Sequence, residues 1–390
     1  MNRITSPDKS GRLLSLDILR GITIAGMIMV NNPGSWSYAY APLKHAHWHG
    51  LTPTDLVFPF FMFIMGVSTF LSLRKFNFEP SRAAVWKIVR RTFLIFVMGL
   101  ALGWFGQFCR GLASGESFFE ASTHFNTLRI LGVLQRLALA YGFAALAAVL
   151  VKGKLLPWVV GILLLGYYLI LRFGKGFEMS EENIIAVVDK ALLGTAHMYR
   201  DTTPEGVRIA FEPEGLLSTL PSVAHVLIGF LSGKLIVENK DNHTRVEKLL
   251  IWGTVLAFSG LLLQYGCPIN KKIWSPTFVL VTTGFASQLL GLLILIIDIH
   301  QKERWSRFFH AFGVNPLIVY VFAGVMANLV ANIRLNWQGE IISVKGFIYE
   351  VLLRPWAGDY FGSLLYALLF ITVCWLFGYI LYKKDIYIKI

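Results

Sequence analysis

The sequence has little charge for its length. Asp, Glu, Lys and Arg make up 15% of its 390 residues, against about 25% in an average soluble domain. Hydrophobic residues make up 55% and recur in runs of about 18–25 residues, each long enough to cross about 30 Å of hydrocarbon. This shortage of charge excludes a string of soluble domains. A membrane β-barrel is excluded as well, because its strands would give short alternating segments.

Cysteine is also scarce. Cys109, Cys267 and Cys374 lie far apart and form no CxxC pair, so they indicate neither a disulfide framework nor a metal site. Zinc-finger spacing and an aromatic-plus-basic RNA motif are missing too. The net charge of +13 therefore does not point to nucleic acid. The basic residues gather in alternate loops, which is the pattern of the positive-inside rule.

What the sequence does contain is a series of about ten apolar runs. We predict an all-α, polytopic integral membrane protein, with about ten transmembrane helices in a single domain. The predicted spans are 14–31, 54–74, 84–105, 128–150, 155–172, 216–237, 248–266, 275–298, 308–331 and 359–382.

An even number of spans places both termini on one side of the membrane. Basic residues are more frequent on that side, most densely in 74–91, so both termini are expected in the cytoplasm. Asp17 and Arg20 interrupt the first apolar run, which favours a retained span over a cleaved signal peptide. The loops expected to face the periplasm are 32–53, 106–127, 173–215, 267–274 and 332–358.

Three local signals refine this outline. Ser180–Leu193 begins with a capping pattern and is expected to form a short surface helix in the longest loop. Pro59 should kink the second span. Asn315-Pro316 should break the ninth span, so that polar backbone there lines a cavity.

The stretch Lys44–Gly66 packs three histidines into five positions and then runs into an apolar helix. His45, His47 and His49 alternate along it and share one face of an extended segment, which suits a metal site or a catalytic base. An ordinary interfacial loop in the aromatic belt is the third interpretation. Asp55 follows Thr52 and Pro53, so it has a helix-starting role, and it could also orient a histidine.

Arginines within the spans form a second group. Asp17 and Arg20 are spaced to pair on one helix face. Arg129 and Arg136 both fall in the predicted span 128–150, seven residues apart, so we expect them to share a helix face about 10.5 Å apart along the axis. A deep arginine such as Arg136 needs an acidic partner or an anionic ligand, and Gln135 beside it adds donors and an acceptor.

Further polar residues stand at the expected periplasmic ends of the spans. Glu214 either favours a helix N-terminus or attracts an ammonium group, and Asn31 is a possible C-cap. Another polar group precedes the eighth span and comprises Asn270, Lys271, Trp274 and Ser275. None of these features is specific alone.

Together, these segments resemble the heparan-α-glucosaminide N-acetyltransferase family. The matching pieces, in chain order, are LDILRGITIAGMIMVNN, KHAHWHGLTPTDLVFPFFMFIMG, RILGVLQRLALAYG, FEPEGLLSTLPS, CPINKKIWSPTFVLVTTG, FGVNPLIVYVF and YILYKKDIYIKI. Members of this family are membrane enzymes that take acetyl from cytoplasmic acetyl-CoA and place it on a terminal glucosamine across the membrane. The resemblance implies a homodimer.

The resemblance assigns roles to residues of this sequence. It places the active-site histidine on His45 and matches Asn31 and Asp55, which makes these three the expected catalytic residues. No metal is expected, because His47 and His49 fall on positions that the family pattern leaves open. Acetyl-CoA is expected near Arg20, Arg129, Arg136, Gln135 and Asn315, and the acceptor near Trp48, Glu214, Asn270, Lys271 and Trp274.

The expected acceptor is smaller than heparan. The chain starts just before the first matching helix, so the large lumenal domain of the animal enzyme is expected to be missing. Glu212 replaces an Asp of the family pattern, so only Glu214 matches that pattern in full. Glucosamine, or a glycan or muropeptide that contains it, is therefore the expected acceptor at the inner membrane. His45 acts either as a general base or as an acetylated nucleophile. An amino-sugar or oligosaccharide transporter is the alternative function, and a structural membrane subunit is a third.

Overall fold

The computed structural model describes residues 13–388 and confirms an all-α, multi-pass membrane protein. Within that range, nine helices are long and apolar enough to cross a membrane. They are α1 (Leu14–Asn31), α2 (Pro53–Leu73), α3 (Arg82–Ala113), α5 (Val133–Leu150), α6 (Leu156–Phe173), α8 (Thr219–Glu238), α9 (Asn242–Leu263), α10 (Pro276–Leu293) and α15 (Asp359–Lys383).

A tenth span is broken, as the sequence predicted. Helices α11 (Arg307–Val314) and α12 (Pro316–Asn332) meet at Asn315 and are bent by 78°. Proline lacks the N–H that a continuous helix would use, so the break falls at Pro316. Counting this pair as one span gives the predicted ten.

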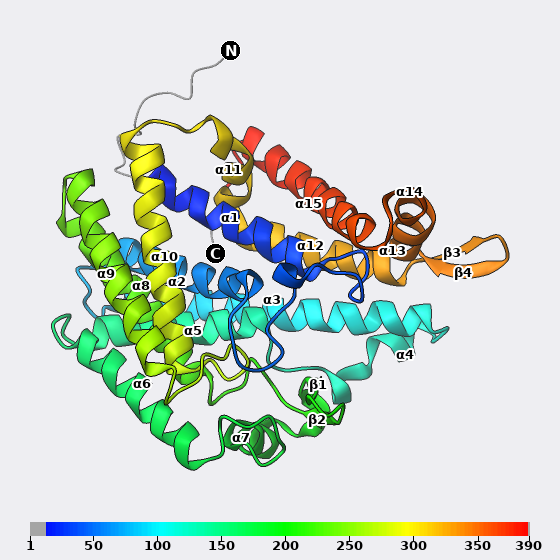
Figure 1. Ribbon diagram of the computed structural model, residues 1–390, viewed down its shortest axis with the longest axis horizontal. Helices are drawn as coiled ribbons and strands as arrows, with labels where there is room; N and C mark the ends of the chain where they lie inside the picture. Colours follow the sequence, from blue (N-terminus) through cyan, green and yellow to red (C-terminus); the bar gives the residue numbers. More distant parts are fainter. Residues whose placement is uncertain (1–12, 389–390) are drawn as a thin grey trace.

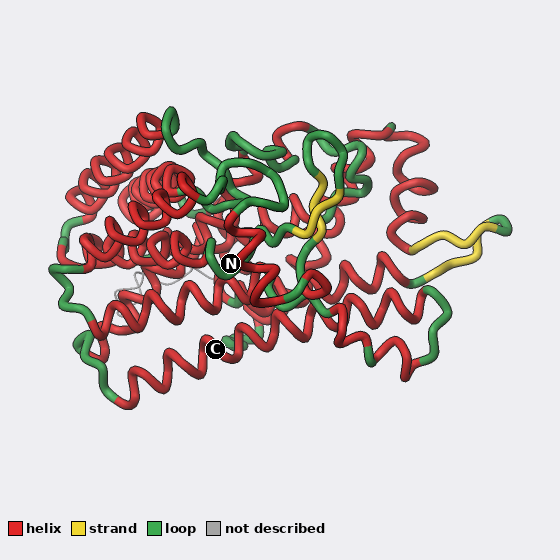
Figure 2. Tube along the Cα trace, turned by 90° about the horizontal axis from the view of Figure 1, so that it is seen from below, coloured by secondary structure: helices red, strands yellow, loops and turns green. Residues whose placement is uncertain are grey.

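Connecting segments lie at the two ends of the helix bundle (Figures 1 and 2). We call one end the basic face; it holds the turns around 74–81, 239–241 and 300–306. The other end is the loop face, which holds 32–52, 114–132, 174–218, 264–275 and 333–358. The loop face also carries the short helices α4 (Phe118–Ser122), α7 (Ile184–Leu193), α13 (Val344–Gly346) and α14 (Arg354–Ala357), and two antiparallel hairpins, β1 (Arg200–Thr202) with β2 (Arg208–Ala210) and β3 (Arg334–Trp337) with β4 (Glu340–Ser343).

Several predicted boundaries were wrong. Helix α3 continues to Ala113, so the first part of the expected loop 106–127 is helical. Helix α5 begins only at Val133, which leaves Arg129 outside the span. The surface helix α7 begins at Ile184 and not at Ser180. Its N-cap is Asn183, whose side chain accepts a hydrogen bond from the backbone N–H of Ile185.

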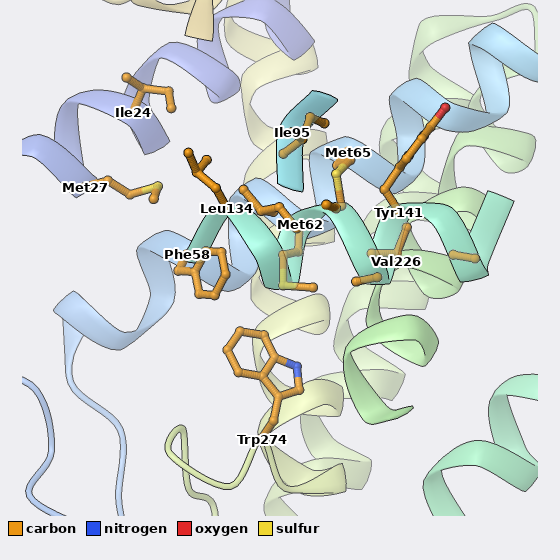
Figure 3. Packing of buried hydrophobic residues seen from close by; sticks show 14 of the residues in the cluster. Ile24, Met27, Phe58, Met62, Met65, Ile95, Leu134, Tyr141, Val226 and Trp274 are labelled. Carbon is orange, nitrogen blue, oxygen red and sulfur yellow. The ribbon is translucent and has the colours of Figure 1, made fainter. Parts of the chain in front are cut away.

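Helix α2 is held in the centre of the bundle by close contacts between small residues. A Cβ on Gly66 would lie 2.1 Å from the carbonyl oxygen of Val226 in α8, and one on Gly229 would lie 2.2 Å from that of Phe63. Such approach between membrane helices needs small residues. Around this contact, α2, α1, α5 and α8 share one hydrophobic core, and Figure 3 shows Phe58, Met62 and Met65 of α2 within it.

The glycine contact between α2 and α8 predicts a stability effect. In Gly229→Ala the new methyl group collides with the backbone of α2. We therefore expect the free energy of unfolding to fall by about 1–3 kcal/mol, with a lower Tm in detergent. The matched control is Gly166→Ala in α6, where a Cβ meets nothing within 4 Å. That control should be neutral or slightly stabilising, because alanine is the better helix former. Equal Tm values for the two variants would contradict the contact.

Candidate active site

The candidate site begins where α2 starts at the loop face. Thr52 is the N-cap and Pro53 the first helical residue, and Asp55 completes a capping box, as the sequence predicted. One carboxylate oxygen of Asp55 accepts hydrogen bonds from the backbone N–H groups of Thr52 at 3.0 Å and Ala46 at 3.1 Å, and from the Thr52 hydroxyl at 2.9 Å. Asp55 is fully buried. The helix start therefore fixes an oriented carboxylate beneath the histidine segment.

His45 lies on the other oxygen of this carboxylate. Its Nδ1 is 2.7 Å from Asp55 Oδ1, which confirms the predicted contact. Because a carboxylate only accepts, Nδ1 donates in this contact, and the neutral imidazole then keeps a lone pair on Nε2. The His45 side chain is 40% exposed at the loop face. This is the arrangement of a general base oriented by an acid.

Lys271 is the third member of the group. Its Nζ lies 3.0 Å from His45 Nδ1, 3.3 Å from His45 Nε2 and 3.6 Å from Asp55 Oδ1. Burial lowers the pKa of the Lys271 ammonium, and the charge of Asp55 opposes that effect. The ammonium therefore balances the buried carboxylate while resting against the imidazole. Sequence reasoning selected Lys271, but as an acceptor-binding residue and not as a contact of His45.

The segment 264–275 brings Lys271 to this position. The backbone N–H of Gly50 donates to the carbonyl of Ile269 at 2.8 Å, which ties this segment to the histidine segment. Asn270 is fully buried, its side-chain amide lies 3.4 Å from His49 Nδ1, and its backbone N–H donates to the Ser275 hydroxyl. Asn270 is thus a structural anchor beside the site.

Trp274 and Arg136 form a buried layer beneath the site. The Trp274 ring packs edge-on against Phe58 with centroids 5.3 Å apart (Figure 3), and the Arg136 guanidinium lies 5.1 Å from the Trp274 ring centroid. Arg136 donates to the Ser218 hydroxyl and, at 3.3 Å, to the Gly215 carbonyl. Its Nε and Nη1 are buried and have no partner among residues 13–388. A buried guanidinium with donors to spare suits a polar ligand.

Arg129 lies in a loop-face segment and not, as the sequence had suggested, within a membrane span. Because it precedes α5, the prediction that it shares a helix face with Arg136 is wrong. It pairs with Glu212, and with Glu214 at 2.6 Å. Burial raises the pKa of Glu212. For Glu214, burial also favours the neutral acid, but the charges of Arg129 and Arg136 outweigh it and lower the pKa. No local sequence signal pairs Glu212 with Arg129, because the two residues are 83 positions apart.

A cavity of about 520 Å³ opens at the basic face, opposite His45. Its cations are Arg20 and Arg91; Arg20 bonds to Asp17 at 3.0 Å, as predicted, and to the Ser68 hydroxyl at 2.8 Å. The other residues that line it are Phe61, Ile64, Met65, Ile95, Leu137, Val314, Asn315, Pro316, Leu317, Ile318, Tyr387 and Ile388. The break at Asn315 thus does line a cavity.

Only some of the residues expected near acetyl-CoA line this cavity. Arg20 and Asn315 line it, while Gln135 and Arg136 are buried directly before the lining residue Leu137. The Asn315 amide is engaged by the C-terminal segment, since it donates to the carbonyl of Ile386 and accepts from the N–H of Ile388. Arg129 is not among the lining residues. Ser68 and Arg91 were not singled out individually, because no sequence signal separates them from other helix residues.

The remaining predicted residues lie in other parts of the loop face. Trp48 donates from Nε1 to the carbonyl of Phe177 at 2.8 Å and packs against Phe211. Asn31 is exposed at the end of α1, and His47 is exposed in the loop. Within residues 13–388, no three His, Cys, Asp or Glu side chains lie close enough together to hold a metal ion.

The chain is similar to proteins of one known family. The family model "Heparan-alpha-glucosaminide N-acetyltransferase, catalytic" matches residues 12–265. The chain is 26% identical to the mouse heparan-α-glucosaminide N-acetyltransferase, over 99% of this chain and 62% of that protein. It is 28% identical to the human protein of the same name, over 97% of this chain and 60% of that protein. The chain thus spans about 60% of the length of these relatives.

A buried acid beside the site predicts a pH effect on stability. Asp189 in α7 is fully buried; Oδ1 accepts from the N–H of Leu216 at 2.9 Å, while Oδ2 has no partner among residues 13–388. Burial raises its pKa to about 6. The folded state therefore keeps a proton that the unfolded chain releases near pH 4, so Asp189 costs stability as the pH rises from about 4 to 6.

We expect Asp189→Asn to remove this cost while keeping the bond to Leu216. Between pH 4.5 and 7.5, the wild type should lose about 2 kcal/mol of stability relative to the variant. Tm values measured in detergent across this range check the prediction. Parallel curves for the two proteins would show that Asp189 does not hold a proton.

Proposed function

Because this chain belongs to the heparan-α-glucosaminide N-acetyltransferase catalytic family, we propose that it is a transmembrane N-acetyltransferase. It moves acetyl from acetyl-CoA at the basic face to the amino group of an amino sugar at the loop face. The acceptor is glucosamine, or a glycan or muropeptide that contains it. The observation that carries this proposal is the contact among Asp55, His45 and Lys271 at one end of α2, with a cation-bearing cavity along the other half.

The two faces correspond to the two sides of the inner membrane in this proposal. The basic face is cytoplasmic, because positively charged segments stay on that side, and the loop face is periplasmic. Acetyl-CoA is made in the cytoplasm, so the donor enters at the basic face. The family resemblance also supports a homodimer.

The cavity at the basic face supports binding of the donor. Arg20 and Arg91 are cations suited to the phosphates of CoA. The apolar inner part of the cavity suits the pantetheine arm. Phe61, the α2 lining residue nearest the helix start, lies six residues from Asp55, or about 9 Å along the axis. The thioester therefore has a short distance left to reach His45. Gln135 and Arg136 flank that last part with hydrogen-bond donors.

His45 acts as the general base. Asp55 holds its Nδ1–H, and Nε2 takes a proton from the sugar amine as the nitrogen attacks the thioester carbonyl. The new C–N bond forms, the C–S bond breaks, and the proton passes from Nε2 to the departing CoA sulfur. His45 thus returns to its starting state, and the site needs no other proton source.

Two further groups support the transition state and the acceptor. Asn31 and Lys271 carry N–H donors for the oxyanion. Lys271 begins 3.3 Å from His45 Nε2, so it must move aside as the amine enters, which also takes its charge toward the developing oxyanion. Trp48 forms part of the wall of the acceptor site, the buried Asn270 and Trp274 support that wall from beneath, and Glu214 attracts the ammonium form of the sugar.

The proposal predicts that activity depends on His45 and not on the nearby His47. His45→Gln in nanodiscs should lower the rate of glucosamine N-acetylation by about 10²–10⁴-fold, because the base is lost. The matched control is His47→Gln, an exposed histidine two residues away, which should keep nearly the wild-type rate. Mass spectrometry of the product measures both.

Other outcomes would exclude the proposal. Undiminished acetylation by His45→Gln would remove His45 from the chemistry. Uptake of unmodified amino sugar into proteoliposomes without acetyl-CoA, together with no acetylated product, would favour the transporter instead.

A further inference from the structure

A second hollow, of about 470 Å³, lies between α6, the end of α9 and the start of α10. Its walls are mainly hydrocarbon, from Gly161, Leu164, Leu165, Leu262, Leu263 and Leu280. These residues belong to membrane-spanning helices, and several are exposed on the outside of the bundle. The groove therefore opens toward lipid in the half of the membrane nearest the loop face. We call it the α6–α10 groove, and α6 lies beside the α9–α10 pair in Figure 1.

Glycine creates this groove. A Cβ on Gly161 would meet nothing within 4 Å, and one on Gly266 would approach only the Tyr168 hydroxyl at 4.0 Å. Elsewhere in the bundle, glycines permit close contact between helices, as Gly66 and Gly229 do. Here the same residue type leaves open space on a lipid-facing surface.

The groove has a charged outer end. Gly161, Leu165, Tyr168 and Arg172 are spaced i, i+4, i+7 and i+11, so they share one face of α6. Arg172 is exposed in the last turn and forms no ion pair with any residue in 13–388. A cation one turn beyond an apolar groove lies at the depth of lipid head groups. An apolar wall followed by a cation is complementary to a lipid that has a hydrocarbon chain and an anionic head group.

The outer end of the groove is also close to the candidate active site. Gly266 and Cys267 line the groove, and Lys271, four residues later, contacts His45. Four residues span at most about 14 Å. On the other side, Tyr168 packs against Phe177, whose carbonyl accepts the hydrogen bond of Trp48. A head group anchored in the groove would thus lie within reach of His45.

We propose that the α6–α10 groove binds the hydrocarbon chain of the acceptor, which is an amino sugar carried on a membrane lipid through a phosphate. This inference rests on the proposed function and names its substrate class. The chain occupies the groove, the phosphate meets Arg172, and the sugar amine reaches His45. The transfer itself is unchanged: the amine forms a C–N bond to acetyl, CoA leaves as the thiol, and the amine proton passes through His45. A lipid anchor confines the acceptor to the membrane surface and raises its concentration at the site.

The test compares acceptors that differ only in their chain. The probes are glucosamine, glucosaminyl-phosphoryl-polyprenol, and the same head group on a single isoprene unit, each assayed with acetyl-CoA and protein in nanodiscs. For the wild type, kcat/KM should be at least about tenfold higher for the long-chain probe than for the short one. Gly161→Leu fills the groove and should abolish this preference, while its rate with glucosamine stays at the wild-type value.

The matched control is Gly166→Leu. Gly166 also has open space around it, but it does not line the groove, so this variant should keep the preference for the long chain. Arg172→Gln should weaken binding of both phosphate-bearing probes and leave glucosamine unaffected. Equal kcat/KM of the wild type for the long and short chains would overturn the proposal. An equal loss of kcat/KM by Gly161→Leu with all three acceptors would also overturn it.

A binding arm separates this inference from the proposed function. A fluorescent polyprenyl probe should bind the wild type, should not bind Gly161→Leu, and should resist displacement by phosphatidylglycerol. If phosphatidylglycerol displaces it equally well, the groove is a general lipid site and the inference is wrong. If the probe binds as expected but no acceptor is acetylated, the proposed function fails and the groove assignment stands as lipid binding alone.

Discussion

The arrangement of the loop face depends on one buried carboxylate. Asp55 begins α2 by capping its first turn, holds the histidine segment through the N–H of Ala46, and fixes His45 through its second oxygen. Lys271 then ties segment 264–275 to Asp55 through an ion pair. A buried carboxylate is costly unless its oxygens are paired. Here each oxygen is paired, so stability of the helix start and orientation of the base come from the same group.

Asp55 and the cation-bearing cavity lie at different levels along α2. Asp55 and His45 stand at the loop-face end of α2, while the cavity with Arg20 and Arg91 lies along the half toward the basic face. Close glycine contacts hold α2 against α8, so the helix that joins the two sides cannot easily shift. A rigid central helix with one polar site at each end suits transfer of a group between substrates that never share a compartment.

The sequence predicted the helices well and the site unevenly. Long apolar runs and the Asn315-Pro316 break determined the spans, and local spacing predicted the capping box and the pair of Asp17 with Arg20. Contacts between distant segments could not be predicted in this way: Lys271 is 226 residues from His45, and Glu212 is 83 residues from Arg129. Arg129 was placed in a helix because apolar residues surround it, although the chain is extended up to Gly132. The α6–α10 groove arises from missing side chains, which hydropathy does not register.

The most direct test of the account is the sidedness of the reaction. Protein is reconstituted into proteoliposomes, its orientation is determined by labelling single cysteines introduced at each face, and acetyl-CoA and glucosamine are supplied on opposite sides of the membrane. Transfer through the bundle predicts acetylated glucosamine only when acetyl-CoA is at the basic face and glucosamine at the loop face. Equal product with the two substrates exchanged, or product only when both are on one side, would contradict transfer through the bundle.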